Sequence, residues 1–166
     1  MREYGNDAVM TTQPLLIAGG GIAGLAVALA AGSRHTRVLE QAPTFQEVGA
    51  GLQIGPNAVR ALQAVGAWDA VSPIATSPPE IHMWDGMSGK RLKRLRLGQV
   101  FEGRFGAPYR LAHRADLHDA LLQVVLARPS IAIEMNAAVT HAAPHEGGVT
   151  ATLASGRSAD GAALIA

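Results

Sequence analysis

The stretch Leu15-Leu-Ile-Ala-Gly-Gly-Gly-Ile-Ala-Gly-Leu25 opens an uncharged run that continues to Gly32. On length alone, this run could be a transmembrane helix or the apolar part of a signal peptide. Three consecutive glycines interrupt it, and each costs about 1 kcal/mol relative to alanine inside a helix. The run is therefore predicted to be a buried strand at Pro14–Ala18, a glycine turn, and a helix from Ile22 to Ala31 that Gly32 ends.

Residues Gly19 to Gly24 match the pattern G-x-G-x-x-G, after a predicted strand and at the start of a predicted helix. Gly19 permits the tight turn, Gly21 lets the backbone approach a diphosphate, and Gly24 lets the helix pack closely against the strand. The diphosphate would meet the amide groups and the positive dipole end of the helix, where Ile22 and Ala23 lie. These five residues are the predicted diphosphate site.

A second strand is predicted at Thr36–Leu39, and it ends in Glu40, at about the spacing of 20 residues expected for a ribose-binding acid. A carboxylate there accepts hydrogen bonds from both ribose hydroxyls and repels a 2′-phosphate. The pattern therefore predicts a site for the adenosine half of FAD or NAD and disfavours NADP. The alternative for Glu40 alone is a solvated loop carboxylate.

The segment Glu47–Asn57 is rich in glycine, which suits either a backbone close to a ligand or a mobile surface loop. After it, a helix is predicted from Pro56 to Gly66, with Val59, Leu62 and Val65 facing the core. The further expected elements are a connection at 72–79, a hairpin of strands Glu80–Asp85 and Arg91–Leu97, a loop at Phe101–Ala107, a strand at Tyr109–Ala112, a helix at Arg114–Ala127, a strand at Ile131–Met135, and short β segments from Val139 to Ile165. Within the last region, Asp160-Gly161 is predicted to be a β-turn, and 162–166 a strand.

The chain has 166 residues, 48% hydrophobic and 16% charged, so one domain or part of one is expected and a disordered chain is excluded. The net charge of +1 gives no overall attraction for nucleic acid or an anionic membrane. Without cysteine there is no disulfide, thiolate or Cys-based zinc chemistry, and the cytoplasm is the expected compartment. The histidines lack metal-site spacing, so no metal is predicted, and most are expected at the surface or at interfaces. They are His35, His82, His113, His118, His141 and His145.

Three blocks carry a resemblance to a known family: Leu16–Leu25 with Val38–Gln41, then Glu47–Asn57, then Pro108–His118. With them the sequence resembles the N-terminal part of single-component FAD-dependent aromatic hydroxylases, the salicylate and 3-hydroxybenzoate hydroxylase type of flavoprotein monooxygenase. The resemblance implies an α/β, Rossmann-like FAD-binding domain with a mostly parallel sheet and an inserted antiparallel β hairpin. Residues 1–166 would be its N-terminal portion, with 74–107 starting an inserted substrate-side β region, and the family's later Asp-Gly and Gly-Asp motifs would follow.

The resemblance also implies that Arg114 contacts FAD and that Ile54 and Tyr109 line the pocket of a small aromatic substrate. A helix-terminal salt bridge remains the alternative for Arg114, and a core role the alternative for the other two. In the intact enzyme, NAD(P)H and O2 would serve to hydroxylate a phenolic or aromatic acid substrate. No catalytic residue and no oligomeric state are assigned. The competing hypotheses are a truncated, non-catalytic FAD-binding fragment and an NAD-dependent dehydrogenase domain.

Overall fold

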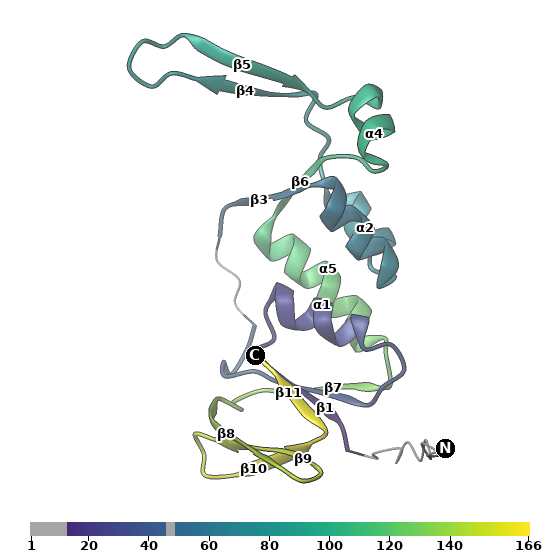
Figure 1. Ribbon diagram of the computed structural model, residues 1–166, viewed down its shortest axis with the longest axis vertical. Coiled ribbons are helices and arrows are strands. Elements are labelled where there is room, and N and C mark those ends of the chain that lie inside the picture. Colours follow the sequence, from purple (N-terminus) through teal and green to yellow (C-terminus); the bar gives the residue numbers. More distant parts are fainter. Residues whose placement is uncertain (1–12, 46–48) are drawn as a thin grey trace, which may run out of the picture.

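The computed structural model describes residues 13–45 and 49–166, and most of its elements stack in three layers (Figure 1). The middle layer is a parallel sheet with the spatial order β11-β1-β2-β7. Its strands are β1 (Leu15–Ala18), β2 (Thr36–Leu39), β7 (Ile131–Glu134) and β11 (Ala163–Ile165). Numbered by their order along the chain, the four strands lie 3-2-1-4, which is the arrangement of dinucleotide-binding sheets. A ligand is therefore expected at the carboxyl end of β1, where the strand order reverses.

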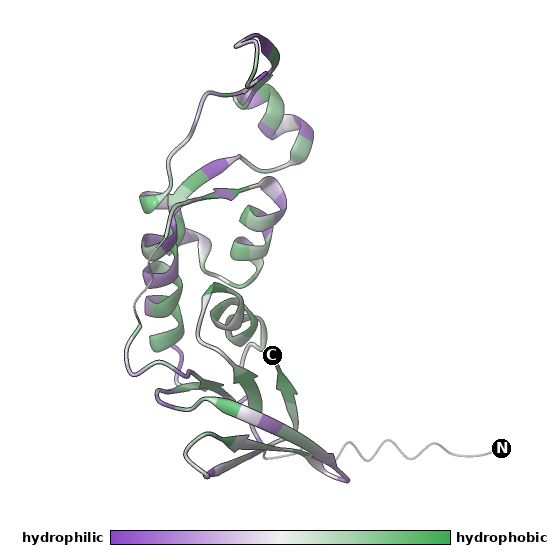
Figure 2. Ribbon diagram, turned by 90° about the vertical axis from the view of Figure 1, so that its left-hand side faces the viewer, coloured by the Kyte–Doolittle hydropathy of each residue, from purple (hydrophilic) through white to green (hydrophobic). Residues whose placement is uncertain are grey.

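Helices cover one face of this sheet. They are α1 (Ile22–Ala30) and α5 (Arg114–Leu126), with α2 (Pro56–Ala64), α3 (Trp68–Val71) and the 3-10 turn η1 (Ser72–Ile74) beyond them. Ala28 of α1 packs on Ile17 and Val38, and these three side chains are buried. In Figure 2 the strands of the parallel sheet and the helix directly above them are mostly coloured hydrophobic. The run from 15 to 32 is thus divided into a strand, a turn and a helix, as predicted.

A three-stranded antiparallel sheet covers the opposite face, in the order β10-β9-β8. Its strands are β8 (Val139–His145), β9 (Gly148–Leu153) and β10 (Ser158–Gly161). Burial alternates along β9, and Val149, Ala151 and Leu153 pack against Leu16 and Leu39 of the parallel sheet. Successive residues of β1 therefore face opposite layers, which explains why that strand is apolar throughout.

Two further pairs of strands extend the molecule away from the parallel sheet (Figure 1). Strand β3 (Gly51–Ile54) pairs with β6 (Arg110–His113), and β4 (Glu80–Trp84) pairs with β5 (Arg91–Arg96), both antiparallel. The predicted hairpin is confirmed. Every residue of β5 is exposed, which suits a strand made mostly of basic side chains.

Two sequence predictions are wrong. Phe101–Ala107, expected to be a loop, lies largely in helix α4 (Gln99–Phe105), which ends at Gly106 with a left-handed φ of 73°. No residue of α4 is buried, so the helix lacks the apolar stripe on which such predictions depend. Asp160-Gly161, expected to be a turn, lies inside β10. Gly161 is needed for close packing, because a Cβ there would lie 2.5 Å from Leu16 Cγ.

Among the described residues, no helix has the length and apolar character needed to cross a membrane.

Glu134, at the end of β7, links the two sheets. Its Oε2 lies 2.6 Å from Arg37 Nη2 in β2, and its Oε1 lies 2.7 Å from Arg157 Nη2, just before β10. The hydrogen bond from Arg37, with a smaller effect of Arg157, lowers the pKa of Glu134 below its ordinary value of 4.5. A lowered carboxyl pKa stabilises the fold above the unfolded-state pKa, and this stabilisation is lost as the pH falls through the folded-state pKa.

We therefore expect Glu134→Gln to lower the free energy of unfolding at neutral pH, by about 1 kcal/mol. The difference from the unchanged protein should shrink as the pH falls below about 4.5, where the unfolded chain takes up a proton, and should vanish only below the lowered folded-state pKa, where both proteins carry a neutral group at this position. Urea denaturation of both proteins at neutral pH and at about pH 4 and below measures this difference. A difference that stays constant with pH would show that the charge of Glu134 does not stabilise the fold.

Candidate cofactor-binding site

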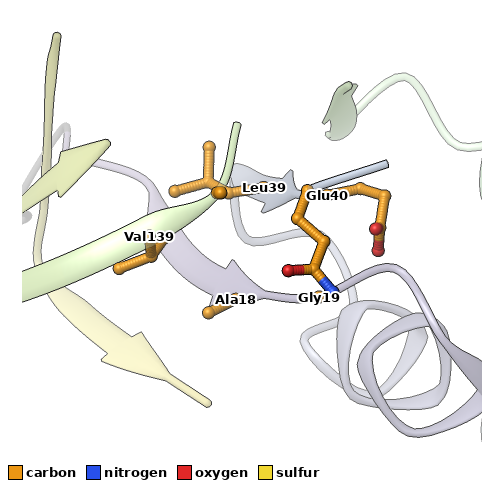
Figure 3. A pocket seen from close by; sticks show the side chains of 7 residues that line it. Ala18, Gly19, Leu39, Glu40 and Val139 are labelled. Carbon is orange, nitrogen blue, oxygen red and sulfur yellow. The ribbon is translucent and has the colours of Figure 1, made fainter. Parts of the chain in front are cut away.

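A cleft of about 210 Å³ opens at the carboxyl ends of β1 and β2. It is lined by Ala18, Gly19, Leu39, Glu40, Gln41, Ala138 and Val139, and Figure 3 shows these side chains around it. The cleft lies at the edge of the parallel sheet where ligands of such sheets bind. The structure thus brings together two of the predicted site residues, Gly19 and Glu40.

The backbone holds the Glu40 carboxylate next to the glycine turn. Its Oε2 accepts a hydrogen bond of 2.6 Å from the Gly20 N–H, and its Oε1 accepts one of 2.8 Å from the Ala42 N–H. A carboxylate offers about four lone-pair sites, so two remain after these contacts. Glu40 is therefore oriented toward the turn and can still accept hydrogen bonds from two hydroxyl groups. Compared with a solvated loop carboxylate, the half-buried Glu40 side chain is fixed in position by these two contacts.

The predicted packing roles of Gly19 and Gly24 agree with the geometry. Gly19 has a φ of 103°, a backbone conformation that residues other than glycine rarely adopt. A Cβ on Gly24 would lie 1.9 Å from the Gly19 carbonyl oxygen, so only glycine lets α1 approach the end of β1. By contrast, a Cβ on Gly21 would meet no heavy atom within 4 Å. The described part of the fold leaves the space beside Gly21 open, as a site for a diphosphate requires.

The first turn of α1 presents unpaired amide groups. Gly21 is the N-cap and provides no side-chain hydrogen bond, and no acidic residue lies in the first turn. The first hydrogen bond joins the Leu25 N–H to the Gly21 carbonyl at 2.9 Å. The N–H groups of Ile22, Ala23 and Gly24 therefore have no partner within the helix. This end of α1 is suited to an anion because the amide groups and the helix dipole act together.

Arg114 begins α5 and is exposed. Its aliphatic part packs on the backbone of the glycine-rich segment, since a Cβ on Gly49 would lie 2.7 Å from Arg114 Cδ. A side chain at this position would have to displace the Arg114 side chain. Glu47 and Val48 lie outside the described residues. Within 13–45 and 49–166 no ion pair includes Arg114, so the alternative of a helix-terminal salt bridge finds no support there.

The two predicted substrate residues lie at the same end of the β3-β6 strand pair, but their surroundings differ. Ile54 is 3% exposed and lines a second cavity, of about 300 Å³, with residues of α1, α2 and α5. Tyr109 precedes Arg110, the partner of Ile54 in the β3-β6 pair, and does not line that cavity. Its hydroxyl is buried without a hydrogen-bond partner among the described residues, and burial raises the pKa of Tyr109. Both substrate roles remain predictions.

Several residues at the site were not predicted. Ala138 and Val139 line the cleft, but two small apolar residues far along the chain carry no chemical signal. His118 is fully buried, with Nε2 2.8 Å from the Gly20 carbonyl oxygen, whereas the other five histidines are exposed as expected. Its helical spacing with the buried Leu121 and Val125 could have indicated that it faces the core.

The strand order, the glycine turn and the carboxylate at the end of β2 define an α/β domain of the dinucleotide-binding class. No family model matches the chain. The chain is 39% identical over 154 residues to a 3-hydroxybenzoate 6-hydroxylase of Polaromonas naphthalenivorans (strain CJ2), which covers 92% of the chain and 38% of that protein. It is also 39% identical to the 3-amino-4-hydroxybenzoate 2-monooxygenase PtmB3 of Streptomyces platensis, over 91% of the chain and 38% of that protein.

Comparisons with solved structures point to the same kind of protein as the sequence relatives do. The tetrameric form of 2-methyl-3-hydroxypyridine-5-carboxylic acid oxygenase matches with a TM-score of 0.78 and 29% identity, over 93% of this chain and 38% of that one. Klebsiella pneumoniae HpxO complexed with FAD and uric acid matches with a TM-score of 0.71 and 25% identity, over 91% and 38%. The chain is therefore homologous to FAD-dependent aromatic-ring monooxygenases of the 3-hydroxybenzoate hydroxylase type, as the resemblance predicted, and it spans about 38% of their length.

Proposed function

We propose that this chain binds FAD and forms the cofactor-binding part of a monooxygenase that hydroxylates a phenolic or aromatic acid. The observation that carries this proposal is the Glu40 carboxylate held beside the glycine turn, with two lone-pair sites left. These sites suit the two ribose hydroxyls of the adenosine half. When bound, FAD supplies the redox chemistry, with NAD(P)H as the reductant and O2 as the oxygen donor, and the protein supplies binding and orientation.

Each part of the site has a proposed role toward the cofactor. The amide groups of Gly21, Ile22, Ala23 and Gly24 hold the diphosphate at the positive end of α1. Arg114 adds a guanidinium group, which suits phosphate or ribose oxygens. Ala138 and Val139 give the far end of the cleft an apolar wall suited to a flat adenine ring.

The absence of cysteine supports the cytoplasm as the place where this protein works.

The substrate class is proposed from the relatives, whose names include 3-hydroxybenzoate, 3-amino-4-hydroxybenzoate and 6-hydroxynicotinate. An aromatic ring that carries a hydroxyl and a carboxylate is common to these compounds. We propose that residues 74–107 begin the substrate-side β region, and that Ile54 and Tyr109 line the substrate pocket. Support comes from the exposed apolar side chains of the hairpin, Trp84 and Leu92 among them, because such surfaces are usually covered by further structure.

A second candidate function is an FAD-binding segment that does not itself catalyse turnover. It is favoured by the share of the relatives that the chain spans, about 38%. The two candidates agree on FAD binding and differ on activity.

We expect the purified chain of 166 residues to bind FAD with saturation. Quenching of flavin fluorescence during a titration measures this binding, and adding ADP in excess should release the flavin, because ADP occupies the same adenosine and diphosphate sites. With FAD present, NADH oxidation should not rise when 3-hydroxybenzoate is added. A rise that depends on the aromatic acid would favour a catalytic chain. Saturable NAD binding without FAD binding would instead support the NAD-dependent dehydrogenase hypothesis.

A further inference from the structure

Both polar groups of Gly20 are hydrogen-bonded to side chains. The Gly20 N–H donates to Glu40 Oε2 at 2.6 Å, and the Gly20 carbonyl oxygen lies 2.8 Å from Nε2 of His118 in α5. A carbonyl oxygen only accepts, so Nε2 carries the proton of this hydrogen bond. His118 thus connects α5 with the middle of the glycine turn, 98 residues earlier in the chain.

His118 occupies a position that an apolar residue would fill at lower cost. It is fully buried on the stripe of Leu121 and Val125, and its ring contacts Phe45 with a centroid distance of 4.9 Å. Its Nδ1 has no hydrogen-bond partner among the described residues, since Asp119 Oδ1 is 3.8 Å away. Burying an unpaired polar atom destabilises a protein. A histidine here therefore points to a role of Nε2 beyond packing.

The hydrogen bond from His118 also sets the direction of the next amide group. In a trans peptide the carbonyl of one residue and the N–H of the following residue point in opposite directions, and the described chain has no cis peptide bond. A Gly20 carbonyl that faces His118 therefore turns the Gly21 N–H away from His118. The space beside Gly21 is open, with no heavy atom within 4 Å of a Cβ built there.

A peptide unit between two glycines needs such an anchor. Glycine has no Cβ to restrict its backbone, so the unit joining Gly20 and Gly21 could rotate at little steric cost. We propose that His118 is a positioning residue that holds this peptide unit with the Gly21 N–H directed at the diphosphate. The inference rests on the proposed binding of FAD, and it adds to the FAD site a residue that lies outside the glycine fingerprint.

Two substitutions separate positioning from packing. His118→Leu fills the same space with an apolar side chain of similar size and removes the hydrogen-bond donor. His118→Gln keeps a donor at a similar distance from the backbone. We expect the leucine variant to bind FAD and ADP about tenfold more weakly, the loss of one well-placed hydrogen bond. The glutamine variant should bind both within about threefold of the unchanged protein. Adenosine, which has no diphosphate, should lose much less affinity than ADP in the leucine variant.

The matched control is Val125→Ala, which truncates another fully buried side chain of α5 farther from the glycine turn. It should lower the free energy of unfolding and leave the affinity for ADP unchanged. Circular dichroism and thermal unfolding establish that each variant is folded. If the leucine variant does not fold, His118→Met, a more adaptable apolar side chain, takes its place.

Several results would overturn the proposal. One is that the folded leucine or methionine variant binds ADP as tightly as the unchanged protein does. Another is that the leucine variant loses as much affinity for adenosine as for ADP. The third is that the glutamine variant binds ADP no better than the leucine variant. If the unchanged chain binds FAD and only the histidine result fails, the proposed function stands and this inference is wrong. If the unchanged chain binds neither FAD nor ADP, the proposed function and this inference both fail.

Discussion

Replacing Glu40 with alanine is expected to weaken the binding of FAD by about 1 to 3 kcal/mol, the contribution of hydrogen bonds to a charged group. The carboxylate stands beside the glycine turn and has lone-pair sites left for two hydroxyl donors. Flavin fluorescence titration measures the loss. Because the substitution also leaves the buried Gly20 N–H without its acceptor, the unfolding of the variant has to be measured in parallel.

A comparison of two nucleotides isolates the ribose contact. The unchanged chain should prefer ADP to 2′-deoxy-ADP, and the Glu40→Ala variant should lose this preference, because its site no longer contacts the ribose hydroxyls. The matched control is Glu134→Ala, which removes a carboxylate from the end of the neighbouring strand, outside the cleft. Glu134→Ala should keep the preference. Equal preference for ADP in the unchanged chain and in a folded Glu40→Ala variant would remove Glu40 from the site.

The second large effect is expected from the glycines of the turn, where two similar substitutions should act on different properties. Gly24→Ala places a Cβ 1.9 Å from the Gly19 carbonyl oxygen, so α1 or the end of β1 has to move. We expect a loss of about 2 to 3 kcal/mol in the free energy of unfolding, as for other substitutions that overpack a core. Denaturant unfolding measures this loss.

Gly21→Ala should leave the fold nearly unchanged. Gly21 has φ −71° and ψ −179°, which alanine adopts without strain, and the added methyl group meets no heavy atom within 4 Å. The cost to stability should be at most about 1 kcal/mol, for a poorer N-cap. The methyl group would, however, occupy the space proposed for the diphosphate, so FAD affinity should fall at least tenfold, or by about 1.4 kcal/mol. Unchanged FAD affinity would place the diphosphate elsewhere.

Local sequence patterns were sufficient for the elements with a buried face. The helices at 22 and 56 begin and end within two residues of their expected positions, because Gly32 and Gly66 stop them in left-handed conformations. Prediction failed for a helix that buries no side chain and so has no hydrophobic pattern, and for a glycine that does not mark a turn. Helix α4 buries no residue, and Gly161 serves close packing on Leu16 and not a turn. Periodicity and turn composition do not contain that information.

The sequence alone determined that a strand, a glycine turn and a helix follow one another, and that an acid ends the next strand. These are local properties, set by hydrophobic periodicity and by the backbone freedom of glycine. Only the tertiary structure decided that Val139 shares a cleft with Glu40 and that His118 reaches the Gly20 carbonyl. Both contacts join segments about a hundred residues apart through the packing of layers, a long-range effect that no short stretch of sequence encodes.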